Sequence, residues 1–461
     1  MTHRILIKNG TVMTLSEGDA QFGATRRADV LIEDGRILEI AAGIEAADVE
    51  TIDAADCLVM PGLIDSHRHV WQTAARGVCH DDTLKGYMRE MRFLRAKAYR
   101  PEDIRIGNWV GMLEAINAGV TTVFDFSHCI NTPEHADAAI EGLRNAGARA
   151  VFAYGFNNVP LEQKGFADVA ARCADLKRVR EKLLPNDDLL VTMASATSDM
   201  PICGIEQLAV EVQASRDLGL RVSIHTNTWE YPERPPEVAV LNEHGLLGDD
   251  LIFVHTNLST DDEIAMVANS GGWIVSTPET EMQMSMGPSV IGRFMRAGGK
   301  PTFGCDIISN NSGDLLVQAR LGLQTQRMLD NAEVLRSRHA ADDVEITTRD
   351  MLKAVTVNGA AALGMESRIG RLEPGMDADV ILVRTDEINT MPIHDPVATL
   401  FLHVHPGNID TVLVAGKILK RNGRLLADMA QVKRELLASH EFVNREIARS
   451  GVTLPEGYQA D

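Results

Sequence analysis

The sequence predicts an α/β fold, a (β/α)8 TIM barrel with a small β-sandwich domain formed by both chain ends. Two observations support it. The middle of the chain repeats a helical stretch that closes on glycine and leads into a short apolar strand. Both ends instead alternate apolar and polar residues in period two, which is typical of half-buried strands. A length of 461 residues suits one large barrel and a smaller domain.

The two chain ends share the strand pattern. In residues 4–56 the dipeptides Asn9-Gly10 and Asp34-Gly35 separate apolar runs, and both predict hairpin turns because their residues tolerate positive φ. The alternation returns late in "GMDADVILV" and "IDTVLVAGKILKRNGRLL". We therefore assign residues 1–56 and 371–430 to the composite β-sandwich domain, 57–370 to the barrel and 431–461 to a C-terminal helical extension.

The middle contains five helix–glycine–strand units, because glycine favours the left-handed turn that ends a helix and buried parallel strands are short and apolar. The units cover residues 101–126, 134–156, 204–227, 260–278 and 289–306. Thr260 and Glu263 have the spacing of a helix capping box. Further strands at 57–60, 188–194 and 250–256 bring the count to eight, as in a TIM barrel. An open doubly wound sheet is the alternative, although no GxGxxG follows the early strands.

Composition argues against several partners. The chain has 65 acidic and 45 basic side chains, a formal charge of −20, which repels phosphate backbones and anionic membranes. We therefore expect no nucleic acid and no membrane as partner. The first residues lack the apolar core of a signal peptide, and no stretch approaches the length of a membrane span. Six scattered cysteines without a CxxC pair indicate reduced thiols and a cytoplasmic protein.

Histidines and one aspartate stand where predicted barrel strands end, the position at which TIM-barrel active sites form. His67 and His69 follow the first strand, and His225, His255 and Asp306 end the fifth, sixth and eighth. Imidazole and carboxylate ligands suit Zn²⁺ or Fe²⁺. His403 and His405 repeat the spacing outside the barrel without such partners, so we interpret them as structural. Cys305, next to Asp306, is interpreted as a small core residue.

These motifs resemble the amidohydrolase superfamily. "PGLIDSHRHV" resembles its first-strand signature PGxxDxHxH, and the order of the later histidines and aspartate is the same. "ILIKNGTVMTL" and "GRLEPGMDADVILV" resemble the split β-sandwich of its cytosine-deaminase-like and chlorohydrolase-like (ATZ/TRZ-type) branch, as do "SNNSGDLL" and "NGAAALGM". The resemblance implies that His67 and His69 are metal ligands.

The resemblance also implies how many metals bind. Members with two metals bridge them by a lysine or glutamate after strand four, and "LLVTMASATSDMPICG" has no Lys, His or Glu at its end. We therefore expect one divalent metal per chain, zinc before iron. Its expected ligands are His67, His69, His225 and Asp306.

By the same resemblance, the metal would activate a water that attacks an sp² carbon of an N-heterocycle-like small molecule. A non-peptide C–N bond would break, by deamination or cyclic-amide opening. Asp306 would take the proton of the water and pass it to the leaving group, and His255, outside the ligand set, would hold the developing oxyanion or orient the attacking water. We expect a small-molecule substrate and a homo-oligomer.

Two motifs depart from those of the branch. Deaminases carry Glu three residues after the strand-five histidine, where this chain has Thr228, and Thr280 and Glu281 replace the usual Ser and Asn after strand seven. Glu281 is the candidate replacement acid, with Glu230 and Glu279 as further candidates.

The sequence allows more than one interpretation of the pocket lining and of the reaction. Trp229 and the alternating Met282, Met284 and Met286 could line a pocket, although core packing would explain the methionines equally well. Displacement of halide or thiol, carbamate or amide hydrolysis, and a non-catalytic ligand-binding barrel are the alternatives.

Overall fold

The computed structural model describes residues 3–156, 165–228 and 236–450, and it confirms the predicted barrel. Eight strands form a parallel sheet in chain order. A parallel bridge between Arg68 and Asp306 brings its two edges together, with the Asp306 N–H donating to the His67 carbonyl (3.0 Å) and the His69 N–H donating to the Asp306 carbonyl (2.8 Å). The strands are β6 (Leu63–Arg68), β7 (Val120–Ser127), β8 (Arg149–Gly155), β9 (Val191–Ala196), β10 (Val222–Thr226), β11 (Leu251–His255), β12 (Trp273–Ser276) and β13 (Thr302–Phe303).

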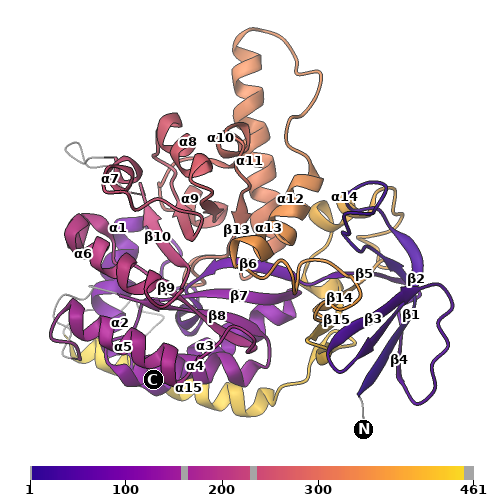
Figure 1. Cartoon of the computed structure of the whole chain (residues 1–461), viewed down its shortest axis with the longest axis horizontal. Coiled ribbons are helices and arrows are strands. Elements are labelled where there is room, and N and C mark those ends of the chain that lie inside the picture. Colours follow the sequence, from indigo (N-terminus) through magenta and orange to yellow (C-terminus); the bar gives the residue numbers. More distant parts are fainter. Residues whose placement is uncertain (1–2, 157–164, 229–235, 451–461) are drawn as a thin grey trace.

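Helices surround this sheet (Figure 1). They include α3 (Pro101–Asn117), α4 (Pro133–Ala146), α5 (Val169–Lys182), α6 (Met200–Arg216), α7 (Glu237–Glu243), α8 (Asp261–Asn269), α9 (Pro278–Gln283), α10 (Ile291–Arg296), α11 (Leu315–Arg336), α12 (Thr348–Ala354) and α13 (Val357–Ala362). The glycines predicted to end five of them all have positive φ, namely Gly119, Gly147, Gly219, Gly271 and Gly298. The capping box of α8 is also confirmed, with the Thr260 N–H donating to Glu263 at 3.0 Å and the Glu263 N–H donating to Thr260 at 3.2 Å.

Between β6 and α3 the chain makes a series of short helices. They are η1 (Val70–Ala75), α1 (Leu84–Tyr87), the π-helix η2 (Met88–Arg95) and α2 (Ala96–Ala98). π-helical turns are rare and are frequent at functional sites. This segment covers one side of the pocket described below.

The predicted second domain is confirmed as a separate mixed sheet of nine strands, in which strands from the first 61 residues lie beside strands from residues 380–425 (Figure 1). Its strand order is β17-β16-β15-β14-β5-β1-β2-β3, with β4 beside β1. The strands are β1 (Arg4–Val12), β2 (Arg26–Glu33), β3 (Arg36–Ala41), β4 (Glu50–Asp53), β5 (Cys57–Pro61), β14 (Val380–Arg384), β15 (Ile409–Val414), β16 (Lys417–Arg421) and β17 (Arg424–Leu425). The limits assigned to the domains stay predictions.

The assignment of residues 57–60 to the first barrel strand was wrong. They belong to β5, which pairs with β1 and β14 in the small sheet, and β6 is the first strand of the barrel. Both strands are fully buried and follow each other closely in the sequence. The sequence therefore did not show that this segment is divided between two sheets. The chain passes from the small sheet to the barrel at Gly62, where a Cβ would collide with Thr121.

One of the two predicted hairpin turns was also wrong. Asp34 and Gly35, both with positive φ, connect the paired strands β2 and β3 as predicted. Asn9 instead lies within β1 at a bulge, where the pairing register shifts and its N–H donates to Asp29 Oδ1 (2.7 Å). A bulge uses positive φ as a turn does, so the dipeptide alone could not distinguish them.

A buried ion pair joins the barrel to the small sheet. Arg149, at the start of β8, donates to Asp379 through Nε (2.9 Å) and Nη2 (3.1 Å) and to Asp377 through Nη2 (2.9 Å). The Arg149 side chain is 1% exposed, and the side chains of Asp377 and Asp379 are 8% and 3% exposed. Asp379 also accepts the Ala415 N–H (2.8 Å), which ties the pair to the end of β15.

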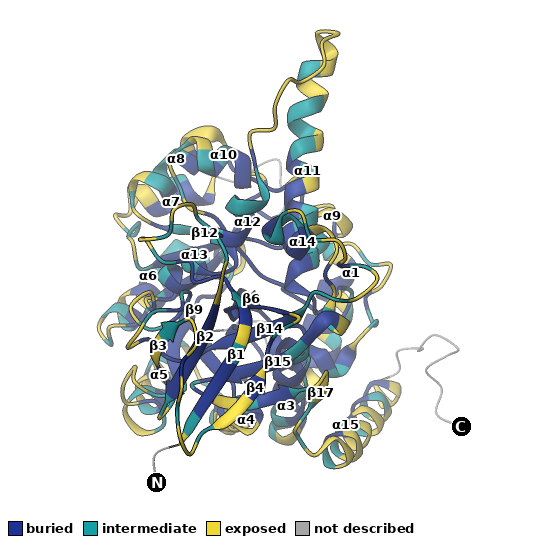
Figure 2. Cartoon of the chain, turned by 90° about the vertical axis from the view of Figure 1, so that its right-hand side faces the viewer, coloured by how far each residue is buried: buried dark blue, intermediate teal, exposed yellow. Residues whose placement is uncertain are grey.

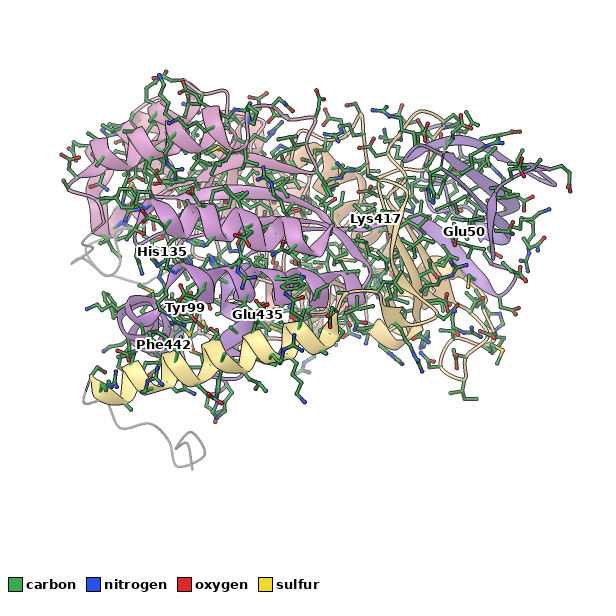
Figure 3. All side chains as sticks on the ribbon, turned by 90° about the horizontal axis from the view of Figure 1, so that it is seen from below. Glu50, Tyr99, His135, Lys417, Glu435 and Phe442 are labelled. Carbon is green, nitrogen blue, oxygen red and sulfur yellow. The ribbon has the colours of Figure 1, made fainter. Side chains whose placement is uncertain are left out.

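The C-terminal helix α15 (Met429–Arg449) runs along the barrel beneath α3 (Figure 3). The Arg100 guanidinium lies 3.4 Å from the centroid of the Phe442 ring, and Arg105 pairs with Glu435. At the opposite side α11 projects from the body, with its far end exposed (Figure 2). Within the described residues, no helix has the length and apolarity that crossing a membrane requires.

Candidate active site

The first strand of the barrel brings His67 and His69 to the pocket. Residues two apart on a strand face the same side, and a buried ion pair fixes the strand beneath them. Arg68 Nε donates to Asp65 Oδ2 (2.8 Å), and both side chains are fully buried. Asp65 Oδ1 accepts the backbone N–H groups of His67 (3.3 Å) and Cys305 (3.2 Å). The aspartate of the DSHRH motif thus ties β6 to the segment that carries Asp306.

Asp306 lies next to both histidines. Its Oδ1 is 3.1 Å from His67 Nε2 and 3.4 Å from His69 Nε2. Burial lowers the pKa of His67 to about 4, and it lowers the pKa of His69 well below the ordinary value. Burial alone would raise the pKa of Asp306, but the hydrogen bond from His67 and the charges of the neighbouring imidazoles hold it at about 2. At neutral pH the imidazoles of His67 and His69 are therefore neutral and the Asp306 carboxylate is ionised, as divalent-metal binding requires.

The orientation of His69 is set by a backbone carbonyl. Its Nδ1 lies 2.8 Å from the Phe126 carbonyl, which can only accept, so Nδ1 carries the proton and Nε2 offers its lone pair towards Asp306. His225, at the end of β10, stacks on the Phe126 ring with centroids 4.3 Å apart. The ring of His225 is 5.2 Å from that of His67 and 5.4 Å from that of His69.

His255 ends β11 with φ of 71°, in the left-handed region that a non-glycine residue rarely adopts. Its Nε2 is 3.9 Å from Asp306 Oδ2. On the other side of the ring, Nδ1 lies 3.1 Å from Thr277 Oγ1 and 3.6 Å from Glu281 Oε1. The five residues predicted from the strand ends therefore meet at one point.

Their donor atoms fit a divalent cation. In the described part of the chain, His67, His225 and His255 form one group and His67, His69 and Asp306 form another, with the ligand atoms of each group within 4.8 Å of one another. His67 belongs to both groups. Imidazole nitrogens with one carboxylate oxygen are the donor set that Zn²⁺ and Fe²⁺ accept.

A pocket of about 470 Å³, including its open mouth, extends from this cluster. His69, His225, His255 and Asp306 lie on its lining. The sequence suggested lining roles for Met282, Met284 and Met286; Met284 and Met286 do line the pocket, whereas Met282 is 43% exposed and is not part of the lining. Thr228 and Thr280 line it too.

The candidate replacement acids lie elsewhere. Glu281 is fully buried, and it accepts hydrogen bonds from Ser276 Oγ (2.8 Å) and the Thr277 N–H (2.7 Å) behind His255. Glu279 accepts hydrogen bonds from Ser312 Oγ (2.8 Å) and Gln318 Nε2 (2.5 Å). Among the described residues, neither glutamate belongs to the pocket lining. Glu230 and Trp229 lie outside the described residues.

The remaining sequence candidates have structural surroundings. Cys305 is fully buried, and burial raises the pKa of its thiol well above the ordinary value. His405 accepts the Gly407 N–H (3.1 Å) at the start of a short helical turn outside the barrel. His403 lies at the end of α14 (Pro396–Leu402).

Sequence reasoning missed four polar residues of the pocket, Tyr87, Arg92, His128 and Asp199. His128 directly follows β7, and Asp199 lies three residues past β9, where Oδ1 is 3.3 Å from His225 Nδ1. The strand-end rule that found the other histidines would have found these two. Tyr87 and Arg92 come from the helices between β6 and α3, and no motif marked that segment.

A parallel barrel with histidines and an aspartate at the carboxyl ends of its strands defines a class of metal-dependent hydrolases. Residues 58–419 match the Amidohydrolase family. The chain belongs to this family.

Similar sequences include curated deaminases. The 5-methylthioadenosine/S-adenosylhomocysteine deaminase of Halobacterium salinarum is 30% identical over 433 residues, covering 90% of this chain and 95% of the relative. The 5'-deoxyadenosine deaminase of Methanosarcina mazei is 27% identical over 452 residues, covering 96% and 99%. The predictions of an amidohydrolase and of a hydrolase acting on non-peptide C–N bonds are confirmed.

Solved structures show the same fold. An adenosine deaminase from Xanthomonas campestris with bound zinc has a TM-score of 0.82 at 24% identity, covering 96% of this chain and 98% of that one. A mutant of the atrazine chlorohydrolase TrzN from Arthrobacter aurescens, complexed with zinc and atraton, has a TM-score of 0.81 at 24% identity, covering 94% and 99%.

Proposed function

We propose that this protein is a hydrolytic deaminase of a small amino-substituted N-heterocycle, with one zinc ion held by His67, His69, His225 and Asp306. The observation that carries the proposal is the meeting of the neutral, buried imidazoles of His67 and His69 with the ionised Asp306 carboxylate beside an open pocket. The deaminases among the similar sequences support the reaction. A zinc ion bound there would supply a Lewis acid that lowers the pKa of a water molecule towards neutral pH.

Asp306 is the proposed base. Its pKa of about 2 keeps the carboxylate ionised before the reaction, so Oδ2 can accept the proton of the attacking water and pass it on to the departing amine. His255 Nε2 faces the same space, 3.9 Å from Asp306 Oδ2, where it orients the water or holds the developing negative oxygen.

Two acidic residues act through histidines in this proposal. Asp199 lies 3.3 Å from His225 Nδ1 and favours a proton there, which turns Nε2 into the ligand atom. Glu281, with Thr277, lies on the Nδ1 side of His255 and fixes the ring. We therefore propose that Glu281 positions His255 and does not itself protonate the substrate.

Thr228 gives a second candidate function. This residue lines the pocket where the branch usually carries a carboxylic acid, and a threonine cannot protonate a ring nitrogen at neutral pH. A leaving group such as chloride or thiolate needs no such proton. Hydrolytic displacement of halide or thiol is therefore the second candidate.

The experiment is a screen of the zinc-loaded enzyme against matched heterocycles that bear an amino, chloro or methylthio group on the same carbon. Deamination predicts ammonia release from amino compounds at a kcat/KM at least tenfold above that for their chloro partners. Preferential release of chloride or methanethiol would favour hydrolytic displacement over deamination. Release of none of the three products would contradict both candidates.

We also propose a cytoplasmic homo-oligomer. All six cysteines are unpaired, as expected for a reducing compartment. The projecting end of α11 and the loop after it expose Met328 (61%), Leu335 (63%) and Val344 (48%), apolar side chains that a second copy of the chain would cover. Sedimentation velocity of the purified protein tests this, and a monomer at micromolar concentration would contradict it.

A further inference from the structure

The pocket beside His69 is lined by hydrogen-bond donors that the proposed reaction does not use. Tyr87, Arg92 and His128 belong to it, and their side chains are buried, with Tyr87 and His128 each 6% exposed and Arg92 4%. We propose that these donors select heterocycles that carry an oxo group. The carbonyl oxygen on the ring would accept a hydrogen bond from the Tyr87 hydroxyl. The inference rests on the proposed function, because it names the substrate class of that same site.

The tautomer of His128 follows from its neighbour. Trp71 Nε1 donates to His128 Nδ1 at 3.0 Å, and an indole N–H can only donate. The Nδ1 atom of His128 must therefore accept, which places the ring proton on Nε2. The ring also stacks on that of His69, with centroids 3.8 Å apart and planes 9° apart, so it cannot turn without losing both contacts.

The Tyr87 oxygen accepts hydrogen bonds, which leaves its own O–H available as a donor. Gln72 Nε2 donates to the Tyr87 oxygen at 2.7 Å, and the Gln72 carbonyl oxygen accepts from Ser309 Oγ (3.1 Å). His128 Nε2, which carries a proton, lies 3.4 Å from the same oxygen. Donors already face its lone pairs, and no other hydrogen-bond partner of the Tyr87 oxygen is found among the described residues, so its O–H is left to donate to an acceptor in the pocket.

Two further observations fit this arrangement. Burial raises the pKa of Tyr87, so the hydroxyl stays protonated across the physiological range. Arg92 carries a permanent positive charge that acts on both Tyr87 and His69, and it favours an electron-rich oxygen at this side of the pocket. Arg92 lies on the π-helix η2, directly after the helix that ends at Tyr87.

A ring without an oxygen here would leave the Tyr87 donor buried and unpaired. A donor left unpaired costs about 10-fold to 100-fold in binding or rate, and sites built around a buried donor discriminate strongly against the analogue that lacks its partner. The pocket should therefore prefer isocytosine to 2-aminopyrimidine, and guanine to 2-aminopurine. Each pair presents the same amino-bearing carbon and differs by the oxo group and the ring proton that accompanies it.

The test compares these pairs on the zinc-loaded enzyme, by kcat/KM for ammonia release and, independently, by calorimetric binding. We expect the oxo member of at least one pair to be preferred at least 10-fold. Tyr87→Phe should reduce that preference about 10-fold or more, acting on the oxo member only, with zinc content unchanged. His128→Phe, which keeps a ring to stack on His69, should weaken it similarly.

Tyr99→Phe is the matched control. Tyr99 is buried at 5% exposure and packs edge-on against Trp71 at 4.9 Å, but its hydroxyl is not part of the pocket lining among the described residues. This variant should leave the preference unchanged.

The outcomes separate this inference from the proposed function. Ammonia release from both members of each pair at equal kcat/KM would overturn the oxo preference and leave the deaminase intact. Selective binding of the oxo members without ammonia release, lost in Tyr87→Phe, would support the preference and contradict the deaminase. Equal binding of both members, no binding of either, or a preference that survives in Tyr87→Phe would overturn the inference.

Discussion

The ion pair between the barrel and the small sheet gives a prediction whose size follows from the structure. Arg149→Met removes a 1% exposed guanidinium that makes three charge-assisted hydrogen bonds, to Asp377 and Asp379. Asp377 keeps Arg368, whose Nη2 lies 2.9 Å away. Asp379 keeps the Ala415 N–H as its hydrogen-bond donor but loses the only ion pair that it forms among the described residues.

The expected loss is large for one side chain. Removing one partner of a buried ion pair costs about 3–5 kcal/mol, because the other charge stays buried without compensation. A chain of 461 residues has an unfolding entropy of about 1 kcal/mol per kelvin, so the melting midpoint should fall by about 3–5 °C. The double variant Arg149→Met with Asp379→Asn should recover most of the loss, because it removes the stranded charge.

Differential scanning calorimetry at one scan rate measures these shifts. Arg449→Met is the control, because Arg449 is 67% exposed in its pair with Glu446 and should change the midpoint by less than about 1 °C. The turnover number of the folded enzyme should not change, since Arg149 lies at the amino end of β8, at the other end of the barrel from the pocket. A midpoint for Arg149→Met within about 1 °C of the parent would refute the reasoning.

Three further predictions concern the site and pH. Burial raises the pKa of Glu211 to about 7, above its ordinary value of 4.5, so stability should be full below pH 4.5 and fall by about 3 kcal/mol as pH rises through 7. Melting curves from pH 5 to 8 should show this fall in the parent, and Glu211→Gln should lack it. If the melting midpoints of parent and variant changed in the same way with pH, the pKa of Glu211 would not be raised. Asp306→Asn should keep the melting midpoint within a few degrees but lose roughly 10²–10⁴-fold in kcat, and near-parent turnover would exclude it as the base. Glu281→Gln should lower kcat by roughly 10–100-fold while the pH–rate profile keeps its shape, whereas loss of one limb of the profile would restore Glu281 as the acid.

Local rules in the sequence predicted most of the fold. Helices that stop at glycine and short apolar strands gave the barrel units correctly, because each signal depends on the conformation of a few adjacent residues. The failures were of another kind. Residues 57–60 and the Asn9-Gly10 dipeptide had the right local conformation, extended chain and positive φ, but which strand each would pair with depends on distant residues.

The site divides in the same way. The strand-end rule identified His67, His69, His225, His255 and Asp306, because the carboxyl ends of parallel strands must meet. This rule could not decide whether Glu281 is the acid, because its burial behind His255 follows from the path of α9. Tyr87 and Arg92 were invisible in sequence because a connecting segment between β6 and α3 brings them to the pocket.

The most direct test of the central claim is the metal content of the purified chain, measured by inductively coupled plasma mass spectrometry beside a His225→Ala variant. His244→Ala, which replaces an exposed histidine at the end of α7, is the matched control. The account predicts close to one zinc per chain in the parent and in the control, and loss of the metal in His225→Ala. Less than about 0.1 metal per chain in the parent after reconstitution with zinc or iron, or full occupancy in His225→Ala, would contradict it.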